Sequence, residues 1–292
     1  MIISNIVGGL GNQMFQYAFV YAFSKKNHQE IRLDTSVYKN RKYINPEGFL
    51  LRKLFQIESK TARSCDYFKV LGIYAPLLTL KNKIPLEKIC KDYIREENIF
   101  CFDEDIFKKL SKKKYVNGWW QVPKYFEDFK EEITELYTFD LDLIEKEYIN
   151  KAKKIESEES VSIHVRLGDY VNNDDLKRIY YICDEDYYKR AIENMINKFP
   201  SAKFYIFSDD IDEAKKLKIF SGHTFIENKN VPSWNDMYLM SKCKHSIIAN
   251  SSFSWWGAYL NNNPKKVTIA PSRWLANKTP TPDILPSNWL KL

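Results

Sequence analysis

The second half of the chain alternates strand-like and helix-like segments from residue 161 to residue 270, and this alternation restricts the fold more than any other feature. Short runs rich in β-branched and aromatic residues read as strands, and the longer runs between them read as helices. The expected strands are 161–166, 203–208, 224–227, 246–250 and 266–270, and the expected helices are 185–199, 211–217, 234–243 and 253–261. Strands joined through helices form a parallel sheet, so this half is predicted to be an α/β domain.

The first half of the chain opens with one similar unit. A β-rich run at 1–7 is followed by a glycine-rich turn and by a helix expected over 13–26. Residues 35–150 are less regular, and a strand at 115–120 is their clearest feature. A chain of 292 residues suits two domains. The charged segment 151–159 is the predicted linker between domains 1–155 and 156–292.

Composition and charge exclude several classes of protein. With 44% hydrophobic and 28% charged residues, the chain is neither disordered nor collagen-like. A net charge of +7 suits an anionic ligand or an anionic membrane face, and no nucleic-acid partner is expected. The five cysteines are odd in number and form no Cys-x-x-Cys, so neither a disulfide framework nor a zinc site is predicted. With no export signal or anchor in view, a cytoplasmic location is expected.

Polar residues stand where the predicted strands end. The strand ends read Arg166-Leu167-Gly168-Asp169, Ser208-Asp209-Asp210 and Asn250-Ser251-Ser252. Ligands of parallel sheets bind beyond the carboxyl ends of the strands. Arginine, hydroxyl groups and the exposed amides of a helix start are the groups that hold phosphate. This edge is therefore predicted to bind a phosphorylated ligand.

The glycine-rich turn Gly8-Gly9-Leu10-Gly11-Asn12 follows the first strand. It has neither the Gly-x-Gly-x-x-Gly spacing of dinucleotide folds nor the Lys-Ser/Thr ending of a P-loop, which argues against redox and NTPase functions. The freedom of glycine at positive φ serves a tight turn as well as a ligand site. Asn12, placed among the first helical amides, favours a ligand contact.

His164 and Arg166 lie two residues apart on one strand, so their side chains point to the same face. Arg166 has two interpretations. It forms a structural ion pair with Asp169, or it clamps a phosphate through two parallel hydrogen bonds. Its place at the end of a strand, before a glycine turn, favours the clamp.

Three carboxylates have a structural and a functional interpretation each. Asp209 and Asp210 together can hold a divalent metal; alternatively, Asp209 orients a ribose hydroxyl or Asp210 caps a helix. Asp-x-Asp strings also begin at residues 103, 140, 184 and 210, so the string itself says little about a metal. Asp236 lies in an apolar run; it is either a surface carboxylate or the acceptor of two hydrogen bonds from a guanine edge.

The segment Asn250-Ser251-Ser252 supplies three residues able to cap the following helix. One cap is enough, which leaves hydroxyl groups for phosphate oxygens. Trp255 and Trp256 are consecutive, so one is expected in the core and the other on the wall of a cleft. The proline-rich tail from residue 271 is expected to follow an irregular path.

Together these segments resemble the bacterial α-1,2-fucosyltransferases of glycosyltransferase family 11, relatives of the animal enzymes that make the H blood-group structure. The matching stretches are GGLGNQMFQYAF at 8–19, QVPKYF at 121–126, HVRLGDYV at 164–171, FSDD at 207–210 and CKHSIIANSSFSWWGAYL at 243–260. They keep the family's order and cover almost the whole chain. Leu167 departs from the pattern, because many relatives carry a second arginine there.

The resemblance implies an α/β fold of the GT-B type, with two facing Rossmann-like domains and a cleft between them. It implies GDP-fucose as the donor substrate of the second domain, and a galactose-terminated or lipid-linked glycan over the first. Transfer to the 2-hydroxyl of galactose would proceed with inversion, without a metal or another cofactor. Such an enzyme builds lipopolysaccharide or O-antigen repeats in the cytoplasm, and its charge of +7 would hold it at the inner face of the membrane.

Within this frame Arg166 is predicted to grip the β-phosphate, and Asn12 to support the phosphate or fucose from the first domain. Asp169 is the candidate base for the galactose hydroxyl. An ion pair with Arg166 would lower the pKa of Asp169 and leave it only an orienting role. Ser251 and Ser252 are expected to contact the phosphates, and Asp236 and His164 the guanosine. Besides Arg166, the residues expected around the nucleotide are His164, Ser208, Asp209, Asp236, Asn250, Ser251 and Ser252.

Two other functions stay open. One is a metal-dependent transferase that uses another nucleotide sugar. The other is a non-catalytic galactoside-binding module whose aromatic side chains serve as stacking platforms. Neither accounts for strand ends suited to phosphate.

Overall fold

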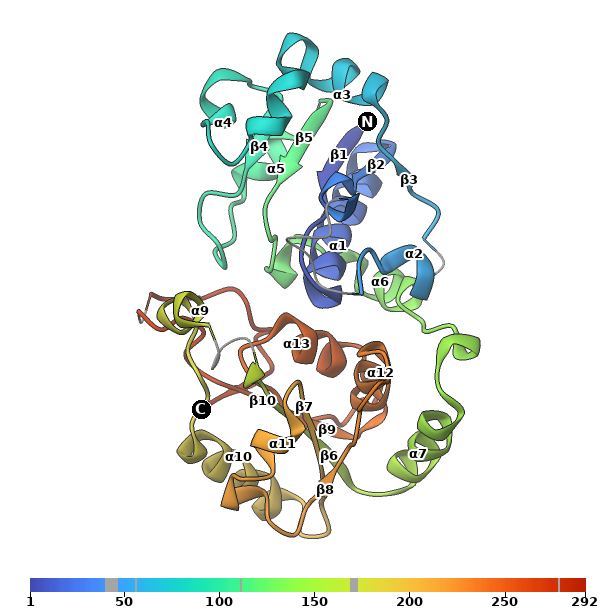
Figure 1. Cartoon of the computed structure of the whole chain (residues 1–292), viewed down its shortest axis with the longest axis vertical. Coiled ribbons are helices and arrows are strands. Elements are labelled where there is room, and N and C mark those ends of the chain that lie inside the picture. Colours follow the sequence, from blue (N-terminus) through green and yellow to red (C-terminus); the bar gives the residue numbers. More distant parts are fainter. Residues whose placement is uncertain (40–46, 56, 111, 169–172, 278) are drawn as a thin grey trace. The chain divides into compact units, whose positions relative to one another are not determined.

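The computed structural model describes residues 1–39, 47–55, 57–110, 112–168, 173–277 and 279–292. The chain forms two compact units (Figure 1). Unit 1 comprises Met1–Thr138 and Pro282–Ile284, and unit 2 comprises Phe139–Thr281 and Leu285–Leu292. None of the helices in these ranges combines the length and the apolar character that a membrane crossing needs.

Unit 1 is built on a parallel sheet with the strand order β3-β2-β1-β5-β4. Its strands are β1 Ile2–Asn5, β2 Ile31–Asp34, β3 Lys60–Thr61, β4 Tyr93–Arg95 and β5 Lys114–Asn117. The register places Ile3 opposite Arg32 on one side and Tyr115 on the other. Because the strands are parallel, their carboxyl ends lie at one edge of the sheet, and the residues that follow each strand are found at that edge.

The helix α1, Leu10–Asn27, follows β1 directly and is apolar on nearly all sides, as a helix enclosed by its own domain should be. Phe19 of α1 stacks on Trp120 with ring centroids 4.1 Å apart. The other α-helices of unit 1 are α2 Leu51–Leu54, α3 Ser64–Leu71, α4 Leu86–Ile89, α5 Asp105–Lys109 and α6 Lys130–Leu136. Its 3-10 helices are η1 Ser36–Lys39, η3 Gly72–Leu80, η4 Pro123–Tyr125 and η5 Glu127–Phe129.

Unit 2 contains a second parallel sheet, ordered β11-β10-β9-β6-β7-β8. Its strands are β6 Ser160–Val165, β7 Lys203–Ser208, β8 Thr224–Phe225, β9 His245–Ile247, β10 Thr268–Ala270 and β11 Leu290–Lys291. Its helices are η6 Leu141–Leu143, α7 Lys146–Ser157, α9 Asp174–Ile179, α10 Glu185–Lys198, α11 Ile211–Ala214, η7 Lys218–Phe220, α12 Trp234–Lys242 and α13 Ser252–Tyr259. The predicted α/β class, with two parallel sheets, is confirmed.

The predicted linker is wrong. Residues 151–157 belong to α7, which buries Tyr148, Ala152 and Ile155 along one face. These positions recur at helical spacing, so the charges of the segment cover the solvent face of an amphipathic helix. The two units divide between residues 138 and 139, whereas the boundary was placed between 155 and 156.

The expectation that one of Trp255 and Trp256 would line a cleft is also wrong, because both side chains are fully buried. Trp255 stacks on Tyr259 and lies 5.4 Å from the ring of Trp289 in the carboxyl-terminal tail. The tail therefore covers the face of α13 that was expected to be open. It is not wholly irregular either, since it adds strand β11 to the sheet.

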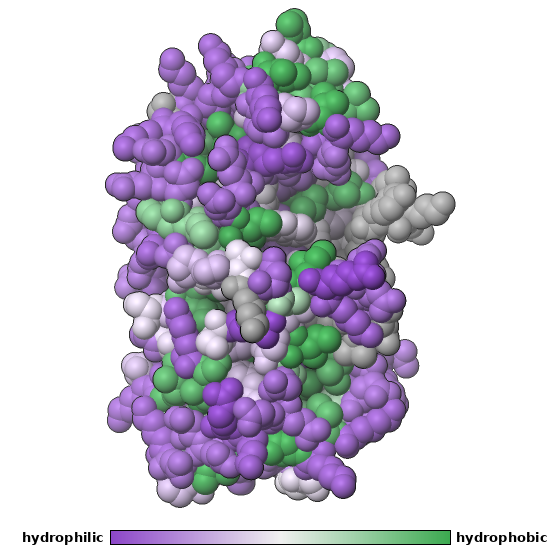
Figure 2. Space-filling view, turned by 90° about the vertical axis from the view of Figure 1, so that its left-hand side faces the viewer, coloured by the Kyte–Doolittle hydropathy of each residue, from purple (hydrophilic) through white to green (hydrophobic). Residues whose placement is uncertain are grey.

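The surface of unit 1 is uneven in polarity. Figure 2 shows hydrophobic atoms gathered at the end of unit 1 that carries α3 and α4, beside strongly hydrophilic side chains.

Candidate functional site

The carboxyl edge of the unit 2 sheet brings Arg166 and Asp209 together. Arg166 follows β6, Asp209 follows β7, and these two strands are neighbours in the sheet. The Arg166 Nη1 atom lies 2.9 Å from Asp209 Oδ2, and Asp209 Oδ1 accepts the backbone N–H of Leu167 at 2.9 Å. One carboxylate thus fixes both the guanidinium and the turn behind it. A guanidinium carries five N–H donors, so it can hold a carboxylate and a phosphate together.

Gly168 leaves the space that the Asp209 carboxylate occupies. A Cβ atom at this position would lie 2.6 Å from Asp209 Oδ2, far inside van der Waals contact. The ion pair considered from the sequence joined Arg166 to Asp169, which lies outside the described residues. The acid that the structure places against Arg166 is Asp209, forty-three residues further along the chain.

His164 lies on β6, two residues before Arg166, and is almost fully buried. Burial, and then the positive charge of Arg166, lowers the pKa of His164 to about 3, so its ring is neutral near pH 7. Among the described residues its Nδ1 atom has no hydrogen-bond partner. Its ring lies 5.9 Å from that of Phe253, at the start of α13. A neutral imidazole in this position can offer a donor or an acceptor to a nucleoside, but no positive charge.

The Ser208-Asp209-Asp210 turn is closed by its own side chains. Ser208 Oγ donates to the carbonyl of Asp210 and accepts the N–H of Asp210, both at 3.0 Å. Asp210 caps α11 by accepting the N–H of Glu213 at 3.1 Å. Asp210 therefore has the capping role, and Asp209 is the carboxylate that reaches the arginine. Within the described ranges no three His, Cys, Asp or Glu side chains are grouped closely enough to hold a metal ion.

The start of α13 divides its polar residues between two tasks. Ser251 caps the helix, its hydroxyl accepting the N–H of Phe253 at 3.3 Å. Asn250 is buried and donates through Nδ2 to the carbonyls of Tyr181, at 2.5 Å, and Trp274, at 3.0 Å. These bonds give Asn250 a structural task, and its contact with a nucleotide stays a prediction. Ser252 is the first residue of the helix and is only partly buried, as a phosphate ligand there would need.

Asp236 is a buried carboxylate on α12, so it is not the surface group considered as an alternative. Its Oδ2 accepts Asn228 Nδ2 at 2.7 Å, and the same nitrogen donates to the carbonyl of Ser208 at 3.1 Å. Asn228 thus ties Asp236 to the end of β7. It was missed in the sequence, although it directly follows the expected strand 224–227 and the strand-end rule could have found it.

In unit 1 the turn after β1 holds Asn12 and needs glycine. Gly8 has φ +83°, and a Cβ atom there would lie 2.6 Å from Asn12 Nδ2. Asn12 Oδ1 accepts Gln121 Nε2 at 2.7 Å, which fixes the orientation of the amide. Gln13 is buried beneath the turn, with Nε2 donating to the carbonyl of Gly8 at 3.1 Å. The polar pair after the glycines therefore contains a structural Gln13 and an Asn12 whose contact with a ligand stays a prediction.

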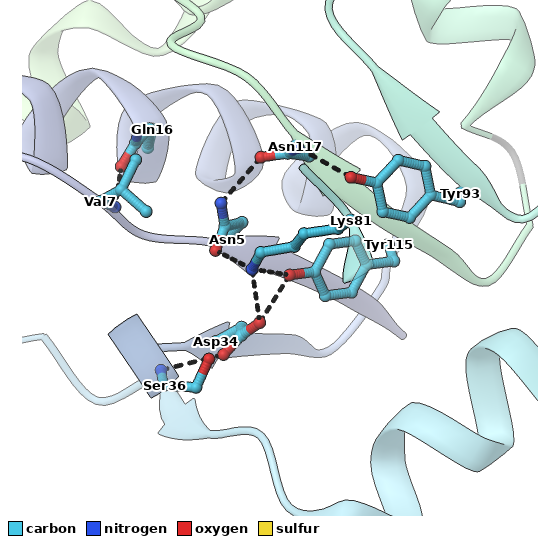
Figure 3. Close-up of polar contacts among 9 residues, drawn as sticks. All are labelled: Asn5, Val7, Gln16, Asp34, Ser36, Lys81, Tyr93, Tyr115 and Asn117. Carbon is cyan, nitrogen blue, oxygen red and sulfur yellow. Dashed lines mark hydrogen bonds and ion pairs between the residues drawn. The ribbon is translucent and has the colours of Figure 1, made fainter. Parts of the chain in front are cut away.

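Behind this turn a polar network joins the ends of β1, β2 and β5 (Figure 3). Lys81 Nζ donates to Asn5 Oδ1 at 2.8 Å and Tyr115 OH at 3.1 Å, and lies 3.4 Å from Asp34 Oδ2. Burial alone would raise the pKa of Asp34, but the charge of Lys81 and the hydrogen bond from Tyr115 outweigh it and hold the pKa below its ordinary value. Asn117 links Asn5 to the neighbouring strand at 2.7 Å. The strand ends under the turn are thus rigidly connected.

Glu96, directly after β4, is a second feature that the sequence reading missed. Its Oε2 atom accepts the backbone N–H groups of Trp119 at 2.6 Å and Trp120 at 3.1 Å. Its Oε1 atom is buried and has no hydrogen-bond partner within the described part of the chain. Burial raises the pKa of Glu96 to about 7, against the opposing effect of the two backbone bonds. Such a carboxyl group exchanges its proton near neutral pH.

Two Rossmann-like units in one chain, one of which holds an arginine–aspartate pair at a strand edge suited to phosphate, are typical of the GT-B-type glycosyltransferases. A mutant of Arabidopsis thaliana FUT1, solved in complex with GDP, has a similar fold, with a TM-score of 0.52 over 97% of this chain and 73% of that one, at 12% identity. The chain belongs to glycosyl transferase family 11, whose family model matches residues 1–292. The predicted family is therefore confirmed.

Its curated relatives span bacteria and primates. The chain is 36% identical to an alpha-1,2-colitosyltransferase of Escherichia coli, covering 100% of this chain and 99% of the relative. It is 28% identical to the O-antigen biosynthesis glycosyltransferase WbnK of Escherichia coli, with 99% of each chain covered. It is 23% identical to galactoside alpha-(1,2)-fucosyltransferase 1 of Saimiri boliviensis boliviensis, over 87% of this chain and 63% of that protein.

Proposed function

We propose that this glycosyltransferase moves L-fucose from GDP-β-L-fucose to the 2-hydroxyl of a terminal β-galactose. The observation that carries the proposal is the Arg166–Asp209 pair at the carboxyl edge of the unit 2 sheet. Further support comes from the relatives, two of which are named for α-1,2 transfer, and from a fold neighbour solved with GDP.

In the proposed reaction the galactose 2-hydroxyl oxygen attacks the anomeric carbon of fucose. The bond from that carbon to the β-phosphate oxygen breaks, and GDP leaves with the bonding electrons, so the configuration inverts. Negative charge grows on the diphosphate as the bond breaks, and a donor already in position stabilises it without reorganisation. Arg166, oriented by Asp209, is proposed to supply this positive charge in place of a metal ion, and GDP-fucose is a substrate, so no separate cofactor is needed.

The other contacts follow from where the side chains lie. Ser252 and the first amides of α13 are proposed to bind the phosphates, beside the Ser251 cap. Asp236 and the neutral His164 are proposed to read the guanine base. Asn12, from the unit 1 turn, is proposed to contact the fucose or its phosphate.

Two carboxylates are candidates for the base that receives the proton of the 2-hydroxyl. Asp169 is the candidate from the sequence. Glu96 is the candidate from the structure, because a pKa of about 7 suits a general base at neutral pH. The pH dependence of kcat separates them: Asp169→Asn or Glu96→Gln should abolish the dependence on a basic group, whichever carries it. If both variants keep the profile of the unchanged protein, neither carboxylate is the base.

Colitose is the second candidate for the transferred sugar, because a relative at 36% identity is a colitosyltransferase. Colitose differs from fucose by the lack of the 3-hydroxyl group. A site that binds that hydroxyl rejects the deoxy sugar by about 10⁴-fold, whereas a site that does not bind it discriminates weakly. Comparing kcat/KM for GDP-fucose and GDP-colitose therefore decides between the two donors.

The direct test of the proposed function is incubation with GDP-fucose and a set of β-galactosides, followed by linkage assignment of the product by NMR. An α-1,2-linked fucose supports the proposal. Transfer that requires a divalent metal and uses another nucleotide sugar supports the metal-dependent alternative. Binding of galactosides without any transfer supports the carbohydrate-binding module.

The natural acceptor is proposed to be a lipid-linked glycan of O-antigen type, since one relative is named for O-antigen biosynthesis. The reaction would then take place in the cytoplasm at the inner face of the membrane. Comparison of a free β-galactoside with the same sugar on a polyprenyl diphosphate carrier tests this. A higher kcat/KM for the carrier-linked sugar is expected.

A further inference from the structure

One surface of unit 1 exposes large apolar side chains that the proposed reaction does not use. They belong to α3, η3 and α4, and each exposes a large fraction of its surface to solvent: Phe68 56%, Ile73 84%, Leu80 40% and Ile89 48%. We call this surface the α3–α4 patch. It covers residues 63–91 and lies where Figure 2 shows hydrophobic atoms gathered on unit 1.

The apolar side chains and neighbouring lysines line one hollow. Its volume is about 490 Å³, and its lining includes Phe68, Ile73 and Ile89 together with Lys69 and Lys91. One acid, Asp92, also lines it, and this carboxylate lies 2.8 Å from the amine of Lys114. Segments separated by some twenty residues in the chain therefore present one continuous surface. Exposed apolar side chains and two lysines thus share this surface.

The charge of the patch is strongly one-sided. Residues 63–91 contain six cations and two acids, Asp66 and Glu87, a balance of +4 out of +7 for the whole chain. Four of the lysines are exposed, and in the described ranges no carboxylate oxygen lies within 4.0 Å of their amines: Lys69, Lys83, Lys88 and Lys91. Their charges are therefore available to an anionic partner.

The opposite side of the same segments is firmly held. Val70, Leu71 and Leu86 pack in a core cluster with Tyr93 and Tyr115 of the sheet. The patch is thus the outer face of a layer whose inner face is built into unit 1. An apolar face flanked by lysines, on a rigid support, is the plan of interfacial segments that lie in a lipid surface.

We propose that the α3–α4 patch docks on an anionic lipid bilayer, with Phe68, Ile73 and Ile89 among the acyl chains and the four exposed lysines on acidic headgroups. Charge complementarity selects this partner, because exposed lysines outnumber the acids of residues 63–91, of which Asp66 is buried and Glu87 lies 3.8 Å from Arg95. This inference deepens the proposed location at the membrane. It does not depend on fucosyl transfer, because binding is measured without either substrate.

The test is sedimentation of the full chain with vesicles of phosphatidylcholine alone or with a quarter of phosphatidylglycerol. Binding to the anionic vesicles only is expected. It should weaken as salt rises from 0.1 M to 1 M, where the Debye length falls from about 10 Å to about 3 Å. Equal binding to both vesicles, or to neither, overturns the proposal.

Two variants locate the surface. The first replaces the four lysines by glutamine, K69Q/K83Q/K88Q/K91Q, and each change should weaken binding to anionic vesicles about fivefold. Its matched control changes four exposed lysines of unit 2, K153Q/K154Q/K189Q/K265Q, and so removes the same charge. We expect the patch variant to lose binding to anionic vesicles and the control to retain it. Equal loss in both would mean that net charge alone binds the protein and that the patch has no special role.

The second variant, F68S/I73S/I89S, removes the apolar groups, and its control, L141S/I196S, removes exposed apolar groups of unit 2. Vesicle binding should fall at least tenfold in the first and stay unchanged in the second. If F68S/I73S/I89S unfolds, the lysine variant alone tests whether the patch binds vesicles. The four lysine side chains are exposed, so their replacement should leave the fold intact. If the unchanged chain is a dimer that F68S/I73S/I89S dissociates, with no binding to vesicles, the patch is a contact between copies and the proposal is wrong. Transfer to a soluble galactoside is measured in parallel on the unchanged chain; its absence there would count against the proposed function, whereas the vesicle result would stand on its own.

Discussion

Glu96 makes the stability of the protein depend on pH in a way that one substitution removes. In the folded chain its pKa is about 7, against an ordinary value of 4.5. Between these two values the unfolded carboxyl group releases its proton while the folded one keeps it. The unfolded state therefore binds fewer protons, and the free energy of unfolding falls as pH rises from 4.5 to 7. At 1.36 kcal/mol per pH unit, the total loss is about 3 kcal/mol.

The substitution Glu96→Gln abolishes this titration and keeps an oxygen for the N–H groups of Trp119 and Trp120. Urea unfolding at pH 5 and pH 8 measures the effect for both proteins. Between these pH values, the stability of the variant relative to the unchanged chain should rise by roughly 2–3 kcal/mol. All other groups titrate alike in both proteins and cancel in the difference.

The matched control is Glu97→Gln, which alters the next residue, an exposed glutamate. Its pH dependence should follow that of the unchanged chain. If Glu96→Gln also followed it, the burial of Glu96 would not be what perturbs its proton affinity, and its candidacy as a general base would lose its physical support.

The remaining predictions concern unit 2. Arg166→Ala should lower kcat by about 10²–10³-fold with folding intact, because a preorganised donor to the leaving phosphate is lost; steady-state kinetics beside the exposed control Arg190→Ala tests this, and equal rates would contradict it. Gly168→Ala should lower kcat/KM by roughly 10–100-fold, because its Cβ would displace Asp209 and with it the arginine; an unchanged value would show that the Asp209 contact is dispensable. His164→Gln should make the protein less sensitive to acid. Below pH 6.5 the unfolded histidine takes up a proton that the folded one refuses until about pH 3, so the unchanged chain loses this contribution to stability as pH falls and the variant does not, as acid unfolding monitored by circular dichroism would show. Identical acid transitions would mean that His164 is not buried as a neutral ring.

The periodic part of the chain was predictable because short apolar strands alternate with amphipathic helices. The strand 203–208 was placed with its observed bounds, and the helix 185–199 ended one residue late. Strand β11 was missed because two residues in a proline-rich tail carry no periodicity. The helix α7 was missed because its many charged residues were interpreted as a linker, although Tyr148, Ala152 and Ile155 recur at helical spacing.

The sequence predicted that the site lies at the carboxyl edge of the sheet, but it did not predict which side chains there contact one another. Strand-end reasoning selected Arg166 and Asp209 separately, yet their contact depends on β6 and β7 being neighbours, which local sequence does not specify. Asp236 was found as an acid in an apolar run, but its partner Asn228 was not. Glu96 follows a strand of only three residues in the irregular region, so the sequence had no signal for it.

The central claim is that the Arg166 guanidinium, held by Asp209, supplies the positive charge that a metal ion provides in other transferases. A crystal structure with GDP, grown with magnesium and manganese present, tests it most directly. We expect the β-phosphate within about 3 Å of the Arg166 nitrogens, with the Asp209 contact retained. A diphosphate bound away from Arg166, or coordinated by either metal, would contradict it.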